Sequence, residues 1–165
     1  MPVKDGKPVR PLVLAAALLL TATACGGDES ALEGSLSELV DLRYRKVSVV
    51  QTQDELSVRF LWPEGASEDV VLRVTASLVG VVPNPRQPLD LAEQNDLGEV
   101  RGRVGRAVRN DPVTEFPPPR RGALTFQSHL QKGSTVEGEL HLTFENGTEL
   151  ASGRTVFGTF EANIE

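Results

Sequence analysis

Residues 136–144 (VEGELHLTF) and 156–164 (VFGTFEANI) share one pattern, in which apolar residues or glycine take every second position and mostly polar residues take the positions between them. A period of two is typical of a β-strand that buries one face, because successive side chains point to opposite sides of a strand. The two segments therefore predict two neighbouring strands whose apolar faces lie on the same side of a sheet.

The connection between these segments begins with Glu145-Asn146-Gly147. A two-residue Asn-Gly loop would place Phe144 opposite Glu149 and mix an apolar face with a polar one. A three-residue loop with Gly147 in the left-handed conformation keeps the apolar faces together, so we expect this second register. It pairs Phe144 with Thr148, Leu142 with Leu150 and Val136 with Val156.

The rest of the chain after residue 25 shows the same period. Strand patterns extend over residues 56–62 and 70–78, and shorter ones occur at 42–44, 47–49, 100–108 and 124–130. Helical periodicity is not sustained for three turns, although residues 32–39 have room for one or two turns. We expect an all-β domain, an antiparallel β-sandwich of about eight or nine strands, with an up-and-down β-barrel as the alternative.

The first residues have the features of an export signal. Lys4, Lys7 and Arg10 make the start of the chain positively charged, and residues 12–20 are all Leu, Val or Ala. An apolar run of nine residues suits a signal peptide and is too short to span a bilayer. Residues 1–24 are therefore predicted to be a signal peptide.

Residues 20–27 (LTATACGG) resemble the lipobox of bacterial lipoproteins, in which small residues precede a cysteine that receives lipid. Ala22 lies three residues before the cysteine, where leucine is commoner in a lipobox. Residues 22–24 also suit an ordinary A-x-A cleavage site, and in either case the cut is expected before Cys25. Cys25 is the only cysteine in the chain. We expect lipidation of Cys25, the alternative being a secreted protein with a free thiol.

The lipoprotein resemblance implies a location and a first partner. Acyl chains on Cys25 would bind the protein to a membrane, and Gly26 after the cysteine implies transport to the outer membrane. The sequence of the exported domain also resembles those of small uncharacterised lipoproteins of Gram-negative bacteria. This resemblance implies no function. The chain is thus divided into a signal peptide (1–24), a lipidated cysteine with a flexible tether (25–34) and a single β-domain (35–165).

The exported part is acidic. Removing three cations and one anion with residues 1–24 leaves 14 Lys and Arg against 22 Asp and Glu, from 17 and 23 in the whole chain. An acidic domain without a clustered basic surface is not expected to bind nucleic acid.

Arginines are the candidate binding residues. Arg101, Arg103 and Arg109 would lie on one face of a strand, and Arg120 and Arg121 would join them if the proline-rich loop at 110–122 folds back. Guanidinium groups match carboxylate and phosphate, so such a patch would bind an anionic headgroup or polysaccharide. The alternative is an outer sheet face whose arginines pair with neighbouring acids.

Catalytic and metal-binding patterns are weak. His129 and His141 lie in no recognisable catalytic motif, and the acidic run Asp90, Glu93, Asp96 and Glu99 lacks the spacing of an EF-hand. We therefore expect no enzyme activity, no cofactor and no metal. The leading hypothesis is a lipid-anchored envelope protein that binds another protein or an envelope polymer; the alternatives are a carrier of a small apolar ligand and, less favoured, a hydrolase.

Overall fold

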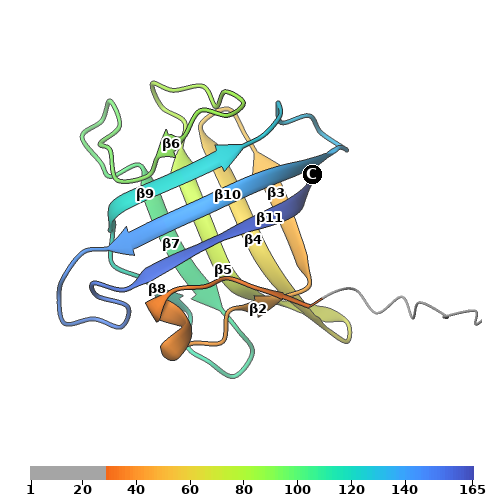
Figure 1. Cartoon of the computed structure of the whole chain (residues 1–165), viewed down its shortest axis with the longest axis vertical. Coiled ribbons are helices and arrows are strands. Elements are labelled where there is room, and N and C mark those ends of the chain that lie inside the picture. Colours follow the sequence, from red (N-terminus) through yellow and green to blue (C-terminus); the bar gives the residue numbers. More distant parts are fainter. Residues whose placement is uncertain (1–28) are drawn as a thin grey trace, which may run out of the picture.

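The computed structural model describes residues 29–165, which form eleven strands and one short 3-10 helix (Figure 1). The strands are β1 (Ser30–Ala31), β2 (Arg43–Tyr44), β3 (Lys46–Gln51), β4 (Glu55–Glu64), β5 (Ser67–Ser77), β6 (Leu89–Asp90), β7 (Gly102–Ala107), β8 (Thr114–Glu115), β9 (Pro119–Phe126), β10 (Thr135–Phe144) and β11 (Thr155–Ile164). The helix η1 (Ser35–Glu38) lies within the segment where one or two helical turns were expected. No helix among residues 29–165 is long and apolar enough to cross a membrane.

Nine strands form one curled sheet in the order β6-β9-β10-β11-β3-β4-β5-β7-β8, and β1 pairs separately with β2. The sheet folds over itself, so that β9, β10 and β11 cross in front of β3, β4, β5 and β7 (Figure 1). The predicted all-β architecture is confirmed. It lies between the two expected forms, because one continuous sheet supplies both layers.

The two layers are joined by a parallel pair, whereas the sequence pattern predicted antiparallel neighbours. Asn163 of β11 is opposite Ser48 of β3, and Ile164 is opposite Val49. The pairing is limited to these two positions. The strands separate beyond it, which lets the sheet turn from one layer into the other.

The expected register of the β10–β11 hairpin is wrong. Leu142 is opposite Val156 rather than Leu150, and Val136 is opposite Ala162 rather than Val156. Both registers keep the apolar faces together, because they differ by an even number of residues. The longer loop is closed by backbone hydrogen bonds from Phe144 to Arg154 (3.0 Å) and from Gly153 to Glu145 (2.9 Å).

The β-domain begins earlier than residue 35, so the predicted flexible tether is too long. Leu32 is buried, and the backbones of Glu33 and Phe157 exchange two hydrogen bonds of 2.8 and 2.9 Å. Paired and buried backbone belongs to the fold, so the domain starts at Ser30. The predicted signal peptide and Cys25 lie outside the described residues.

The two ends of the curled sheet meet at Leu91. The N–H of Leu91 donates to the carbonyl of Gly122 in β9 at 2.9 Å, and the carbonyl of Leu91 accepts from Gly102 in β7 at 2.7 Å. Leu91 therefore connects the β9 and β7 ends of the sheet and nearly closes a barrel.

Aromatic rings fill the space between the layers. The Tyr44, Phe60, Phe160 and Phe126 rings follow one another with centroid distances of 5.1, 5.3 and 6.2 Å. Phe60 and Phe144 are fully buried, surrounded by leucines and valines from every long strand. Burial of this apolar surface supplies the main stabilising free energy of the domain.

Candidate functional site

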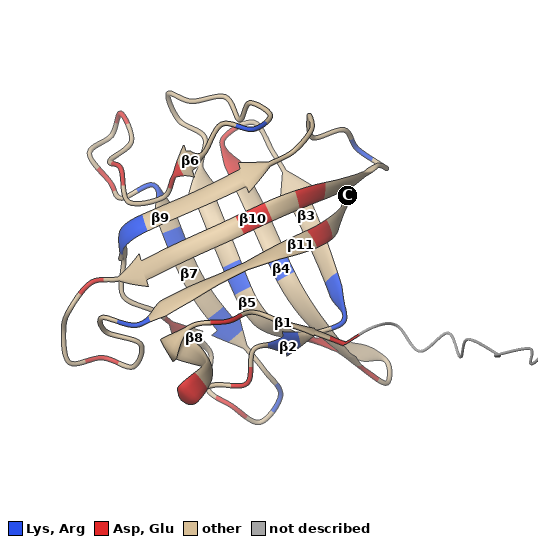
Figure 2. Cartoon of the chain, in the orientation of Figure 1, with Lys and Arg blue, Asp and Glu red and all other residues tan. Residues whose placement is uncertain are grey.

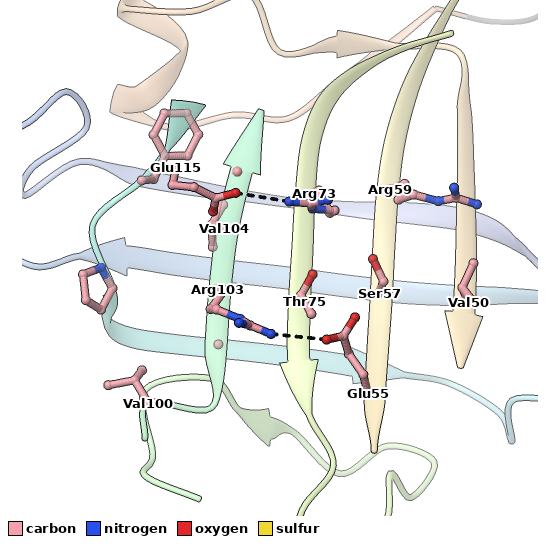
Figure 3. Close-up of a pocket in the computed structure, with 14 residues that line it drawn as sticks. Val50, Glu55, Ser57, Arg59, Arg73, Thr75, Val100, Arg103, Val104 and Glu115 are labelled. Atoms are coloured by element: carbon pink, nitrogen blue, oxygen red, sulfur yellow. Dashed lines mark hydrogen bonds and ion pairs between the residues drawn. The ribbon is translucent and has the colours of Figure 1, made fainter. Parts of the chain in front are cut away.

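A groove of about 790 Å³ lies on the outer face of β3, β4, β5 and β7 (Figure 3). Its charged lining consists of Arg59, Arg73 and Arg103 with Glu55 and Glu115. We call it the arginine groove. It is open to solvent, on the side of this layer that faces away from the core.

The strand register brings the three arginines together. Arg59 on β4 is directly opposite Arg73 on β5. Arg103 on β7 is opposite Thr75, two residues along the strand from Arg73, so Arg73 and Arg103 are diagonal neighbours. All three occupy positions that alternate with buried residues, and therefore point outward.

Each arginine of the groove has one carboxylate partner. Arg73 lies 3.1 Å from Glu115 and Arg103 lies 3.3 Å from Glu55 (Figure 3). Arg59 lies 2.7 Å from the carboxylate of Glu165 and donates through Nε to the Ser48 hydroxyl at 3.0 Å. These pairs offset the like charges of Arg59 and Arg73, which would otherwise repel across the strands.

Small residues leave space between these long side chains. Ser57 and Thr75 lie between the charged positions, and Gly105 has no side chain to cover the face. Phe116 and Pro118 belong to the segment that passes from β8 to β9 and line one side. The groove thus combines hydroxyls and paired charges with a limited apolar wall, which suits an extended polar ligand.

The groove arginines have unused hydrogen-bond donors. A guanidinium group has five N–H donors. Among the described residues, the guanidinium groups of Arg73 and Arg103 each make one hydrogen bond, to Glu115 and Glu55 respectively. Each can therefore donate to a further carboxylate or phosphate oxygen.

The five arginines predicted from the sequence do not form one patch. Arg101 is buried, and its side chain donates to the carbonyls of Ser77 (2.9 Å) and Val79 (3.2 Å). It lies 3.5 Å from the carboxylate of Glu93 in the loop before β7. Arg101 lies just before the first residue of β7. Because its side chain binds these two carbonyls, it stabilises the loop after β5 and does not share the outer face with Arg103.

The remaining predicted arginines lie elsewhere. Arg109 follows the end of β7 and lies near the β4–β5 turn, 3.6 Å from Glu64, and donates to the Ser67 hydroxyl. Arg120 and Arg121 are exposed on β9, in the other layer. Only Arg103 of the five lines the groove.

Sequence reasoning did not select Arg59 and Arg73. Each is a single arginine in a strand whose other outward residues are mostly uncharged, so neither stretch is conspicuous. The period of two does predict that both side chains point outward. Their proximity depends on the β4–β5 register, and the approach of β7 to β5 depends on the sheet order.

Acidic side chains gather on the outer face of β10 and β11 in the other layer. Glu137 and Glu161 are directly opposite one another on β10 and β11, and Glu139 lies on the same outward face (Figure 2). His141 also lies on this face, stacked at 6.2 Å on the Phe157 ring, and His129 is exposed after β9. Both histidines are therefore outside the groove.

Comparisons with protein-family models, with curated protein sequences and with solved structures found no match for this chain.

Proposed function

We propose that this protein is an exported, lipid-anchored protein of the cell envelope whose β-domain is a non-enzymatic binding module. Its ligand is an envelope polymer that bears carboxylate or phosphate groups, and the arginine groove is the binding site. The observation that supports this best is the placement of three outward arginines on three adjacent strands, two of which use one donor each.

The spacing of the arginines favours a polymer over a single small anion. Neighbouring strands are about 4.8 Å apart, so β4 and β7, on either side of β5, are separated by roughly 10 Å. That separation spans successive charged groups of an extended chain. Arg59, Arg73 and Arg103 would then each bind a different anionic group.

The existing ion pairs do not block such a ligand. Arg73, Arg103 and their glutamate partners are largely exposed, and an exposed ion pair contributes about 0 to 1 kcal/mol. A ligand carboxylate can add to a guanidinium group or replace the glutamate at little cost. Because the charges are exposed, binding should weaken as salt is raised.

The proposed location follows from the first residues of the chain. The leader and the lipobox-like segment before Cys25 support export and acylation, and Gly26 supports the outer membrane as the destination. No specific observation favours a carrier, because Phe60 and Phe160 occupy the space between the layers, or a hydrolase, because His129 and His141 are outside the groove.

Binding to an immobilised polymer tests the ligand class. We expect the protein to bind polygalacturonate, a carboxylated polysaccharide, at low salt, and not to bind neutral dextran. The triple variant Arg59→Gln, Arg73→Gln, Arg103→Gln should lose this binding.

The matched control removes the same charge from exposed positions outside the groove: Arg120→Gln, Arg121→Gln and Lys132→Gln. We expect this control to bind polygalacturonate nearly as the wild type does. Equal loss in both triple variants would show that only net charge matters, and retention by the groove variant would exclude the groove as the site.

A further inference from the structure

The only tryptophan of the chain lies next to the point where the described residues begin. The Arg43 guanidinium lies 5.7 Å from the centre of the Trp62 ring and that of Arg45 lies 4.4 Å from it. Arg43 also lies 3.1 Å from the carboxylate of Glu29, the first described residue. We call Arg43, Arg45 and Trp62 the tryptophan cluster.

The cluster has one cation that is free to meet another partner. Arg43 is bound by both Asp41 and Glu29, and its hydrogen bonds hold the pKa of Asp41 below the usual value. Arg45 is exposed and makes no ion pair among residues 29–165. Trp62 is half-buried against the core. The Arg45 guanidinium lies over the Trp62 ring, so the cluster presents a cation and an indole ring together.

The early start of the fold leaves little chain between Cys25 and this cluster. Four peptide units separate Cys25 from Glu29, and a fully extended chain covers about 3.3 to 3.6 Å per residue, so Glu29 lies at most about 14 Å from Cys25. An acylated cysteine is held at the bilayer surface. The end of the domain that contains the tryptophan cluster must then stay close to the lipid headgroups.

We propose that the domain docks on the membrane that anchors it, with the tryptophan cluster against the phosphate-bearing headgroups. Arg45 donates to lipid phosphate, and Trp62 lies at the interface, where tryptophan is enriched because its ring is apolar and its N–H is polar. The inference rests on the proposed acylation of Cys25 and assigns a surface that the anchor alone does not specify.

A weak contact is sufficient for this docking. The domain as a whole is acidic, so free protein would gain little from an anionic surface. Anchoring makes the contact intramolecular, and the effective concentration at the surface then reaches about the millimolar range. One guanidinium–phosphate contact and one interfacial ring are enough to orient a tethered domain.

The single tryptophan makes the proposal directly measurable. The acylated mature protein, purified from membranes, is placed in vesicles of phosphatidylethanolamine and phosphatidylglycerol, with or without brominated acyl chains. We expect bromine to quench Trp62 fluorescence and the plain vesicles to shift its emission to the blue. Arg45→Gln should reduce both effects, whereas Arg120→Gln, an exposed arginine on β9, should not.

The anchor and the docking can fail separately. Mass spectrometry of the same preparation determines whether Cys25 is acylated. If it is not, the proposed anchor is wrong, and the sole thiol is coupled to a maleimide lipid in the same vesicles so that Trp62 is still measured. Vesicle-bound protein whose Trp62 emission is the same in brominated and plain vesicles, under either attachment, overturns the docking proposal.

Discussion

Gly102 donates its backbone N–H to the carbonyl of Leu91 at 2.7 Å, and the two residues are too close for a side chain on Gly102. A Cβ atom at this position would lie 2.7 Å from the Cβ of Leu91. A Cβ atom on Gly122 would lie 3.0 Å from the same Leu91 Cβ. The closure of the sheet therefore depends on two glycines facing one leucine.

We expect Gly102→Ala to destabilise the domain by about 1 to 3 kcal/mol, the usual cost of overpacking. The matched control is Gly105→Ala on the same strand, because the atoms nearest to its Cβ would be those of the Glu115 carboxylate, the movable end of a side chain. Urea unfolding of both variants measures the difference. Equal midpoints for the two would contradict the tight closure at Leu91.

The β10–β11 loop gives a second test. Gly153 has a φ of +69°, and a Cβ on it would lie 2.8 Å from the Asn146 side-chain oxygen, whereas Gly147 does not have a positive φ. We expect Gly153→Val to lower the free energy of unfolding by at least roughly 1 to 2 kcal/mol, the cost of a left-handed conformation.

Gly147→Val is the control for that substitution, because its Cβ would meet mainly the flexible carboxylate of Glu149. Its effect on thermal unfolding should be smaller than that of Gly153→Val. A larger effect at Gly147 would support the three-residue loop expected from the sequence and contradict the observed register.

Arg101 is expected to act on stability. Arg101→Met should remove the donors for the Ser77 and Val79 carbonyls and cost about 2 to 4 kcal/mol, because both hydrogen bonds come from a buried guanidinium group. Arg103→Met should cost less than about 1 kcal/mol, since its ion pair is exposed. Chemical denaturation compares them, and similar small losses would mean that the hydrogen bonds of Arg101 do not stabilise the loop after β5.

We expect the domain to lose stability at alkaline pH because it buries Tyr44. Its hydroxyl donates to the carbonyl of Thr159 at 3.3 Å, and burial raises the pKa of this hydroxyl above the usual 10.0. Above about pH 10 the unfolded chain therefore loses this proton more readily than the folded chain, and stability falls as pH rises.

The single tyrosine makes this titration unambiguous. We expect the phenolate absorbance to appear above its usual pH and together with the loss of circular dichroism. Tyr44→Phe should remove this component of the alkaline unfolding. Phenolate formation near pH 10 in a protein that stays folded would show that burial does not hold the hydroxyl neutral.

Cys25→Ser tests the anchor. We expect the variant to leave the membrane fraction and to retain the thermal unfolding midpoint of the wild type, because the cysteine precedes the first described strand at Ser30. Labelled fatty acid should be incorporated into the wild type alone. Membrane association without label, unchanged by the substitution, would contradict acylation at Cys25.

Much of the fold followed from the period of two. The alternation placed strands at residues 56–62, 70–78, 136–144 and 156–164, and the structure has β4, β5, β10 and β11 there. It also gave the outward positions of Arg59 and Arg73, although nothing in the pattern showed that they are neighbours. The tether was misjudged because Leu32 was the single large apolar residue in a small and acidic stretch, and its burial depends on β2 and β11.

The period of two was sufficient to predict the long strands and the face to which their side chains point, and the residue counts gave the acidity of residues 25–165. The β10–β11 register, the parallel β11–β3 pair, the closure at Leu91 and the membership of the arginine groove depend on the folded structure. Alternation fixes only whether a residue points inward or outward. A register shift by an even number of residues leaves each side chain on the same face, and so does a change in strand order. The register and the strand order are therefore set by core packing, loop conformation and space for a Cβ.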